Sequence, residues 1–293
     1  MEIKTPATAI TFGVEIECYM DTGATPVGSY HNGHQVPWLP TGWNAQHDGS
    51  LMTRTPGKMA VEVVSPVLKG AEGLRQVVLA CAEIKARGGF VNDRCGLHIH
   101  LGFQGATAGQ IKRMIAICGN MEAAIFAVTG TKKRERGGYC KGIKESYRGI
   151  NFQAINDLQA HRAVMGRYNL LNLKPIVTGD KPTLELRPFA GTLNPVKIIG
   201  YVLMALAMAE RALNSTGVFV WDDAKPAKDR ALFAQEGRGA GEAEFRKFMY
   251  WFGWSEKAGT KLVWGHVGGE GVPTLPECVG ELVRLCRKYD ASL

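Results

Sequence analysis

Four separate segments of this 293-residue chain alternate apolar residues with ionisable ones. Successive side chains of a β-strand point to opposite faces, so residues two apart share a face. Each segment is therefore expected to form a strand with one apolar and one ionisable face. The ionisable positions are Glu15, Glu17, Glu62, His98, His100, Glu185 and Arg187. A solvated face would explain any one strand, but such faces usually also carry Lys, Thr and Ser, so the whole set indicates a functional surface.

The chemistry that suits this set is metal binding. Carboxylates that converge on one surface repel one another and raise each other's pKa values unless cations lie among them. Carboxylates and neutral imidazoles are also ligand types that suit Mg²⁺ or Mn²⁺. We therefore predict that the four strands share one sheet, whose polar face holds divalent metal ions.

Two other segments carry candidate residues. Asp48 begins the tight-turn signal Asp48-Gly49-Ser50, for which a turn role and a chemical role are equally consistent. The segment 130–150 is basic, punctuated by glycine and without a clear period, which predicts a mobile loop. Its Arg134 and Arg136 could close over phosphate groups, and a solvated run of charges is an equal alternative.

The elements that would position these residues follow from hydrophobic periodicity. Strands are expected at 8–20, 59–65, 96–103, 166–173 and 182–189, and helices at 71–87, 108–128 and 195–214. This order predicts an α+β domain in which helices cover one face of a largely antiparallel sheet. Two further helical patches, at 241–254 and 277–289, predict an appended bundle. We expect a catalytic domain at 1–220 and a C-terminal helical extension at 221–293.

Composition limits the class of protein. Hydrophobic residues make up 45% and charged residues 21%, which excludes a wholly disordered chain. Lys and Arg number 35 against 27 Asp and Glu, and this net charge of +8 favours nucleotides, acidic metabolites or nucleic acid as partners. The most apolar stretch, 198–209, is too short to cross a membrane, and the N-terminus does not resemble a signal peptide. Seven cysteines without a C-x-x-C pair fit free thiols, so a cytoplasmic location is expected.

Short motifs also occur in a fixed order. They are G-V-E-I-E (13–17), H-D-G-S-L (47–51), V-E-V-V-S-P (61–66), C-G-L-H-I-H-L-G (95–102), an arginine at 134 or 136, R-Y-N-L-L-N-L (167–173) and T-L-E-L-R-P-F-A-G-T-L (183–193). Each is common alone, but the ordered series resembles the amidoligase family of the carboxylate–amine ligases, which is grouped with glutamine synthetase and glutamate–cysteine ligase. The resemblance covers roughly residues 10–215 and leaves 221–293 unexplained.

The resemblance implies a glutamine-synthetase-like catalytic sheet, ATP as co-substrate and two or three Mg²⁺ or Mn²⁺ ions. By similarity, the metal ligands are Glu15, Glu17, Glu62, His98 and Glu185. His100 matches a position near the ATP phosphates, and Arg187 matches the arginine at the transferred phosphoryl group. Asp48 resembles the acid that helps to bind and deprotonate the amine. Arg134 or Arg136 would add a phosphate contact.

The activity implied is amide or isopeptide formation through an acyl phosphate. The substrates would be one carboxylate and one amine, carried by a small molecule, a peptide or a protein side chain. No membrane partner is expected, and homo-oligomers occur in this superfamily.

Other functions remain open on the sequence alone. A metal-dependent phosphotransferase or phosphohydrolase on the same scaffold would share the metal and phosphate groups. A cupin-type site would need an acid shortly after H-x-H, and residues 101–109 contain none. Nucleic-acid binding fits the net charge, but no zinc finger, RRM signature or helix-turn-helix signal is present.

Overall fold

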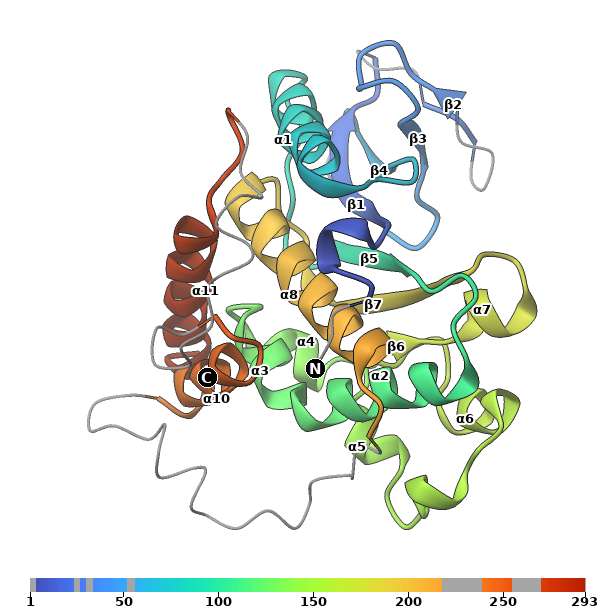
Figure 1. Ribbon diagram of the computed structural model, residues 1–293. Coiled ribbons are helices and arrows are strands. Elements are labelled where there is room, and N and C mark those ends of the chain that lie inside the picture. Colours follow the sequence, from blue (N-terminus) through green and yellow to red (C-terminus); the bar gives the residue numbers. More distant parts are fainter. Residues whose placement is uncertain are drawn as a thin grey trace.

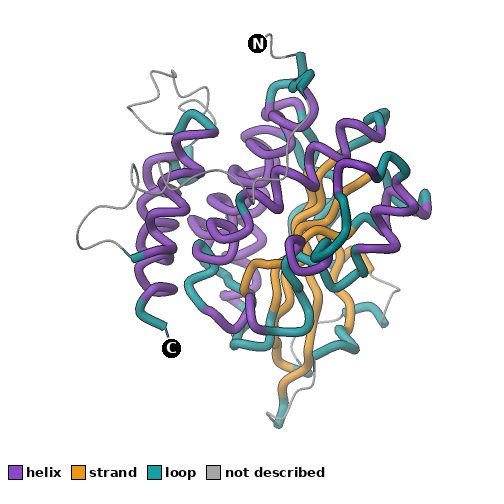
Figure 2. Tube along the Cα trace, turned by 90° about the horizontal axis from the view of Figure 1, so that it is seen from below, coloured by secondary structure: helices purple, strands orange, loops and turns teal. Residues whose placement is uncertain are grey.

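A seven-stranded sheet organises the fold, in the order β2-β3-β4-β1-β5-β7-β6. The structure is a computed structural model that describes residues 4–23, 27–29, 34–51, 56–217, 239–254 and 270–292. The strands are β1 (Phe12–Asp21), β2 (His34–Gln35), β3 (Asn44–His47), β4 (Lys58–Val64), β5 (Gly96–Gly102), β6 (Leu171–Asn172) and β7 (Thr183–Ala190). Every pairing between neighbours in this sheet is antiparallel. The strands form one layer (Figures 1 and 2). Helix α8 (Pro195–Asn214) packs against it, and α1 (Gly70–Ala86), α2 (Ala108–Asn120) and α11 (Leu275–Asp290) pack against α8.

The helices vary widely in length. The α-helices are α1 (Gly70–Ala86), α2 (Ala108–Asn120), α3 (Glu122–Ala127), α4 (Lys132–Arg136), α5 (Ile143–Ser146), α6 (Leu158–Val164), α7 (Lys174–Thr178), α8 (Pro195–Asn214), α10 (Ala240–Trp251) and α11 (Leu275–Asp290). Two 3-10 turns, η1 (Ala7–Ala9) and η2 (Phe152–Ala154), complete them. None of the helices in the described ranges is long and apolar enough to span a membrane.

The hydrophobic core lies between the sheet and α8. Val14, Ile16 and Cys18 of β1 are almost fully buried, whereas Glu15 and Glu17 alternate with them on the opposite face. On the core side Phe189 of β7 stacks on Tyr201 of α8, with ring centroids 4.4 Å apart. The apolar side chains of the long strands thus pack toward the helices, and their ionisable side chains lie on the other face. The predicted α+β fold with an antiparallel sheet is confirmed.

A β-bulge interrupts the pairing of β5 with β7. Leu97 pairs with Phe189 and Ile99 pairs with Leu186, so two residues of β7, Arg187 and Pro188, lie opposite His98. A bulge accommodates one unpaired residue, and proline is tolerated there because it has no N–H to donate to the ladder. The extra residue turns Phe189 toward the core while Arg187 stays on the polar face.

The structure departs from the expected elements in several places. The strand predicted at 166–173 is reduced to β6 at Leu171–Asn172, and the helix predicted at 108–128 is divided into α2 and α3. The composition of segment 130–150 predicts a mobile loop, but the segment contains α4 and α5. The Thr131 side chain caps α4 by accepting a hydrogen bond from Lys133 N. The Gly/Pro/His-rich segment 21–42, for which the sequence predicts a connection, contains the edge strand β2, and β3 follows it at Asn44–His47.

Helices α10 and α11 fit the two expected C-terminal helical patches. They pack against α3 and α8 (Figure 1), and Phe245 and Leu282 belong to the same hydrophobic core as the sheet. The expected domain boundary at 220 lies outside the described residues. All seven cysteines are buried free thiols.

A buried carboxylate joins α10 to α11. Glu242 is 2% exposed and accepts hydrogen bonds from Arg287 Nε and Arg246 Nη2, each at 2.7 Å. We expect Glu242→Gln to lower the free energy of unfolding at neutral pH by about 1–2 kcal/mol, because hydrogen bonds to charged groups stabilise more than neutral ones. Chemical denaturation measures this loss. The control is Glu281→Gln, whose carboxylate is less buried than that of Glu242 and pairs with Arg284 of its own helix; it should cost less than about 0.5 kcal/mol.

The loss of stability in Glu242→Gln should depend on pH. The hydrogen bond from Arg287 lowers the pKa of Glu242, although burial opposes it. A carboxyl group with a lowered folded pKa stabilises the fold above its unfolded pKa, about 4.3 for Glu, and loses this contribution as pH falls through the folded value. The difference between wild type and Glu242→Gln should therefore shrink below about pH 4. A difference that stays constant down to pH 3 would contradict this account of the charge.

Candidate active site

A cavity of about 910 Å³ lies over the polar face of the sheet. Its lining includes all seven ionisable strand residues predicted from the sequence, Glu15, Glu17, Glu62, His98, His100, Glu185 and Arg187. Asp48 and Arg134 also line it, whereas Arg136 is not among its lining residues. The prediction that four strands place these side chains on one surface is confirmed.

Strand register brings the acids and histidines together. Glu17 pairs with Glu62 across β1 and β4, and Glu15 pairs with His98 across β1 and β5. His100 pairs with Glu185 across β5 and β7. Paired residues on one face of a sheet lie within contact distance of each other, so groups that are far apart in the sequence form one cluster.

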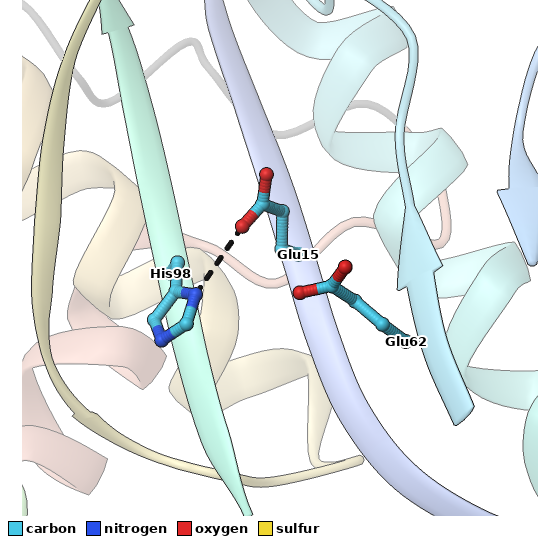
Figure 3. A group of neighbouring side chains, drawn as sticks. All are labelled: Glu15, Glu62 and His98. Atoms are coloured by element: carbon cyan, nitrogen blue, oxygen red, sulfur yellow. Dashed lines mark hydrogen bonds and ion pairs between the residues drawn. The ribbon is translucent and has the colours of Figure 1, made fainter. Parts of the chain in front are cut away.

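Glu15 is the centre of this cluster. Its Oε2 lies 3.2 Å from His98 Nδ1, and its Oε1 lies 3.0 Å from His100 Nε2. Glu15, Glu62 and His98 point toward one another from three adjacent strands (Figure 3). Two sets, Glu15–Glu62–His98 and Glu15–His100–Glu185, each have one ligand atom per residue within 4.8 Å of the others.

These two sets fit divalent cations by their chemistry. Each combines carboxylate oxygens with one imidazole, the donors that suit Mg²⁺ or Mn²⁺. Glu17 lies beside them rather than within either set. One of its oxygens accepts a hydrogen bond from Gly96 N at 2.5 Å, and the other lies 3.6 Å from His98 Nε2.

Neutral side chains orient the cluster. Gln46 Nε2 donates to Glu62 at 2.7 Å, and Asn172 Nδ2 donates to Glu185 at 2.6 Å. Thr183 Oγ1 lies 3.2 Å from His100 Nδ1. Such contacts fix carboxylate and imidazole orientation around a metal. The sequence pattern alone assigns no role to these three residues, although Asn172 and Thr183 lie within the motifs at 167–173 and 183–193.

The pKa values reflect this crowding. Burial raises the pKa of Glu15, but hydrogen bonds with His100 and His98 outweigh it and hold the pKa well below the usual value. Burial and the charge of Glu15 raise the pKa of Glu62 to about 7. Burial lowers the pKa of His98, but the hydrogen bond with Glu15 and nearby carboxylates shift it above the usual value. Protons thus compensate part of the negative charge, a role that a divalent cation would take over.

Two arginines flank the cluster on the β7 side. Arg187 Nη1 donates to Glu185, and Arg187 Nε is buried without a hydrogen-bond partner among the described residues. Arg134 Nη2 donates to Arg187 O at 2.9 Å and Arg134 Nε to Pro188 O at 3.2 Å. Arg134 therefore binds the carbonyl groups of the bulge. Arg136 lies near Tyr289 instead. Burial and the hydrogen bond to Glu135 raise the pKa of Tyr289, and the charge of Arg136 lowers it by a smaller amount.

Asp48 lies in the turn after β3. Its Oδ1 accepts hydrogen bonds from Ser50 N at 2.7 Å and Ser50 Oγ at 2.6 Å. Its Oδ2 is buried with no hydrogen-bond partner in the described ranges. The turn thus fixes one carboxylate oxygen and leaves the other unpaired in a residue that lines the cavity.

The outer cavity wall is cationic and aromatic. Arg94, Arg167 and Lys181 line it, and Lys133 does so while paired with Asp93. Tyr139 is 72% exposed and meets Tyr168 edge-to-face, with ring centroids 5.8 Å apart. Positive charge outside a carboxylate floor suits a ligand that carries several negative charges.

The fold and the site define an α+β protein with a candidate metal- and phosphate-binding cavity. Residues 38–209, more than half of the chain, match the protein family described as "Putative amidoligase enzyme". The chain therefore belongs to this amidoligase family. The match contains Asp48, Glu62, His98 and Glu185 but begins after β1.

Beyond the family, similarity is found among solved structures. A search of the curated proteins found no match. One similar solved structure is named "GmaS/ADP complex-Conformation 1". It is 14% identical over 87% of this chain and 71% of that chain, with a TM-score of 0.40.

Proposed function

We propose that this protein is an ATP-dependent carboxylate–amine ligase that forms an amide bond through an acyl phosphate. Membership of the amidoligase family supports the proposal. The observation that carries it is that two candidate metal-binding sets share Glu15. Arg187 and Arg134 line the same cavity as these sets. Metal ions and arginines placed together suit a polyphosphate, whose negative charge must be neutralised while its phosphoryl group is transferred.

The reaction needs activation because a carboxylate is a poor electrophile. In the first step a carboxylate oxygen of the substrate attacks the γ-phosphorus of ATP, and ADP leaves. In the second step the amine nitrogen attacks the acyl carbon, phosphate leaves and the nitrogen loses a proton. Divalent ions held by Glu15, Glu62, His98, His100 and Glu185 would neutralise the phosphate oxygens. Glu17, next to these ligands, would complete or orient the set.

The arginines would act on the phosphoryl group. A guanidinium forms paired hydrogen bonds with phosphate oxygens in a fixed plane. Arg187 has a buried Nε with no partner in the described part of the chain, so it retains a donor for such a group. Arg134 lies next to it, since its guanidinium binds the carbonyl oxygen of Arg187.

Asp48 would serve the amine. Alkylammonium groups have pKa values near 10 and are mostly unreactive at neutral pH, so a base is needed. The Oδ2 atom that has no partner can accept a hydrogen bond from an ammonium group and then its proton.

Isotope labelling tests the proposal. Pooled amino acids, amines and peptides are incubated with ATP and Mg²⁺, and mass spectrometry seeks products that equal two inputs less one water. ADP should form only when both a carboxylate and an amine are present, and ¹⁸O from the carboxylate should appear in phosphate. Label that stays wholly in the amide would reject the acyl phosphate. ADP formation at an equal rate without an acceptor would instead indicate a phosphohydrolase.

Gly96 permits the close packing of the site. A Cβ at this position would lie 3.1 Å from Arg134 Nη2, 3.2 Å from Glu17 Oε2 and 3.3 Å from His98 Nε2. We expect Gly96→Ala to displace these groups and to lower kcat/KM about tenfold, equivalent to about 1.4 kcal/mol. Steady-state kinetics measures this loss. Gly138→Ala is the matched control because a Cβ there meets no atom within 4 Å; equal kinetics for the two variants would contradict the prediction.

A further inference from the structure

The last turn of α11 contacts α4, the short helix that carries Arg134. The Tyr289 hydroxyl donates a hydrogen bond to the carboxylate of Glu135. Lys132 Nζ donates to the carbonyl oxygen of Ser292 at 2.7 Å and lies 5.7 Å from the centroid of the Tyr289 ring. The first and fourth residues of α4 are therefore both attached to α11.

Helix α4 depends on such contacts for its position. It has five residues, none of them buried, and a helix this short is unstable on its own. On its other side Arg134 binds the carbonyl oxygens of Arg187 and Pro188 at the β7 bulge. The helix thus lies between α11 and the active-site wall.

Helix α11 is a firm support for α4. Leu282, Leu285 and Cys286 are buried in the core. The Asp290 carboxylate accepts hydrogen bonds from Gly241 N at 2.7 Å and Glu242 N at 3.1 Å, which fixes the end of α11 to the start of α10. The last turn of α11 is consequently held independently of α4.

The chain also enters α4 against α11. Gly130, with φ of +73°, lies two residues before α4, and a Cβ there would lie 2.8 Å from Leu285 Cδ2. Only glycine adopts this backbone conformation without strain and allows so close an approach. Helix α11 therefore contacts both the residue that leads into α4 and two residues of α4 itself, Lys132 and Glu135.

We infer that the end of α11 is a positioning element of the active site: Tyr289, together with Ser292 just beyond the helix, holds α4, and α4 holds Arg134 at the β7 bulge beside the cavity. The inference rests on the proposed function in one respect, namely that Arg134 contacts a phosphate of the nucleotide. The family match ends at residue 209, so this role belongs to a part of the chain that the match does not include.

Measurements on the ligand-free protein test whether Tyr289 holds α4 and Arg134 in place. Tyr289→Phe keeps the ring but removes the hydrogen bond to Glu135. Amide hydrogen exchange in residues 131–137 should accelerate about threefold to tenfold, and the Arg134 Nε–H signal in NMR spectra should broaden or exchange faster. Tyr250→Phe, on α10, is the control and should change neither. Unchanged exchange and an unchanged Arg134 signal in Tyr289→Phe would overturn the inference.

Nucleotide affinity tests whether the position of Arg134 affects binding of the nucleotide phosphates. Calorimetric titration with ADP and Mg²⁺ should show binding weakened about threefold to tenfold in Tyr289→Phe and in Glu135→Leu, with no further loss in the double variant. Glu135→Gln retains an acceptor oxygen and should restore the wild-type affinity. A purely structural contact would lower the melting temperature and leave the affinity unchanged, which would overturn the link to Arg134. If the wild type bound no nucleotide, the proposed function would fail, and the ligand-free measurements alone would decide the positioning role.

Discussion

The Glu15→Gln variant should lose metal-dependent nucleotide binding and turnover almost completely. Glu15 is the residue that the two candidate metal-binding sets share, and its two oxygens contact His98 and His100. The amide has the same shape but carries no charge and offers one acceptor oxygen in place of two. Because loss of a residue that merely orients a metal ligand costs about 10–100-fold, loss of a shared ligand should cost about 100-fold or more.

Calorimetry and thermal unfolding separate this effect from misfolding. Titration of ADP in the presence of Mn²⁺ should yield heat with the wild type and none with Glu15→Gln. The melting temperature should stay close to that of the wild type, because relief of the repulsion between Glu15 and Glu62 offsets part of the loss of the contacts with His98 and His100. Glu72→Gln, an exposed substitution on α1, is the control and should bind like the wild type. Wild-type affinity and metal dependence in Glu15→Gln would show that the cluster does not hold the metal.

The polar floor of the site was predictable because strand periodicity reports which face a residue occupies. Alternation around Glu15, Glu62, His98 and Glu185 identified four strands, and the same pattern assigned their apolar partners to the core. An excess of acids over other polar residues then indicated a functional surface rather than a solvated one. These inferences need only local sequence and the geometry of a single strand.

What could not be predicted depends on contacts between strands. The β7 bulge opposite His98 follows from pairing, which periodicity does not encode. Strand β3 is four residues long, and its Gln46 gains its role only through the partner strand, where it binds Glu62. Glu17 lies outside both ligand sets, and its hydrogen bond from Gly96 N likewise depends on contact with a neighbouring strand.

The basic segment shows the same limit. Composition suggested that Arg134 and Arg136 were equivalent members of a mobile loop. The structure distinguishes them because Arg134 finds two carbonyl oxygens at the bulge, whereas Arg136 does not line the cavity. Residues two apart on a helix point in different directions, so a short helix that looked like a loop in the sequence determines which arginine faces the site.

Replacing Asp48 with asparagine should separate the two halves of the proposed reaction. The Oδ2 atom of Asp48 is buried and has no hydrogen-bond partner in the described ranges, while Ser50 holds Oδ1. In Asp48→Asn the amide cannot accept a proton from an ammonium group, so coupling to an alkylamine should slow by about 100- to 10,000-fold, the range of general-base catalysis. Activation of the carboxylate by ATP does not use Asp48 and should persist.

Hydroxylamine provides the decisive comparison for Asp48. It is largely unprotonated at neutral pH, so it can attack an acyl phosphate without help from a base. Asp48→Asn should therefore form hydroxamate from the carboxylate substrate at a rate close to that of the wild type, while amide formation from an alkylamine collapses. Ser50→Ala, which only loosens the carboxylate, should reduce amide formation to a smaller extent and also spare hydroxamate. If Asp48→Asn slowed hydroxamate formation and amide formation equally, Asp48 would act on the shape of the cavity or on the acyl phosphate rather than on the proton of the amine. The base would then be another group that lines the cavity.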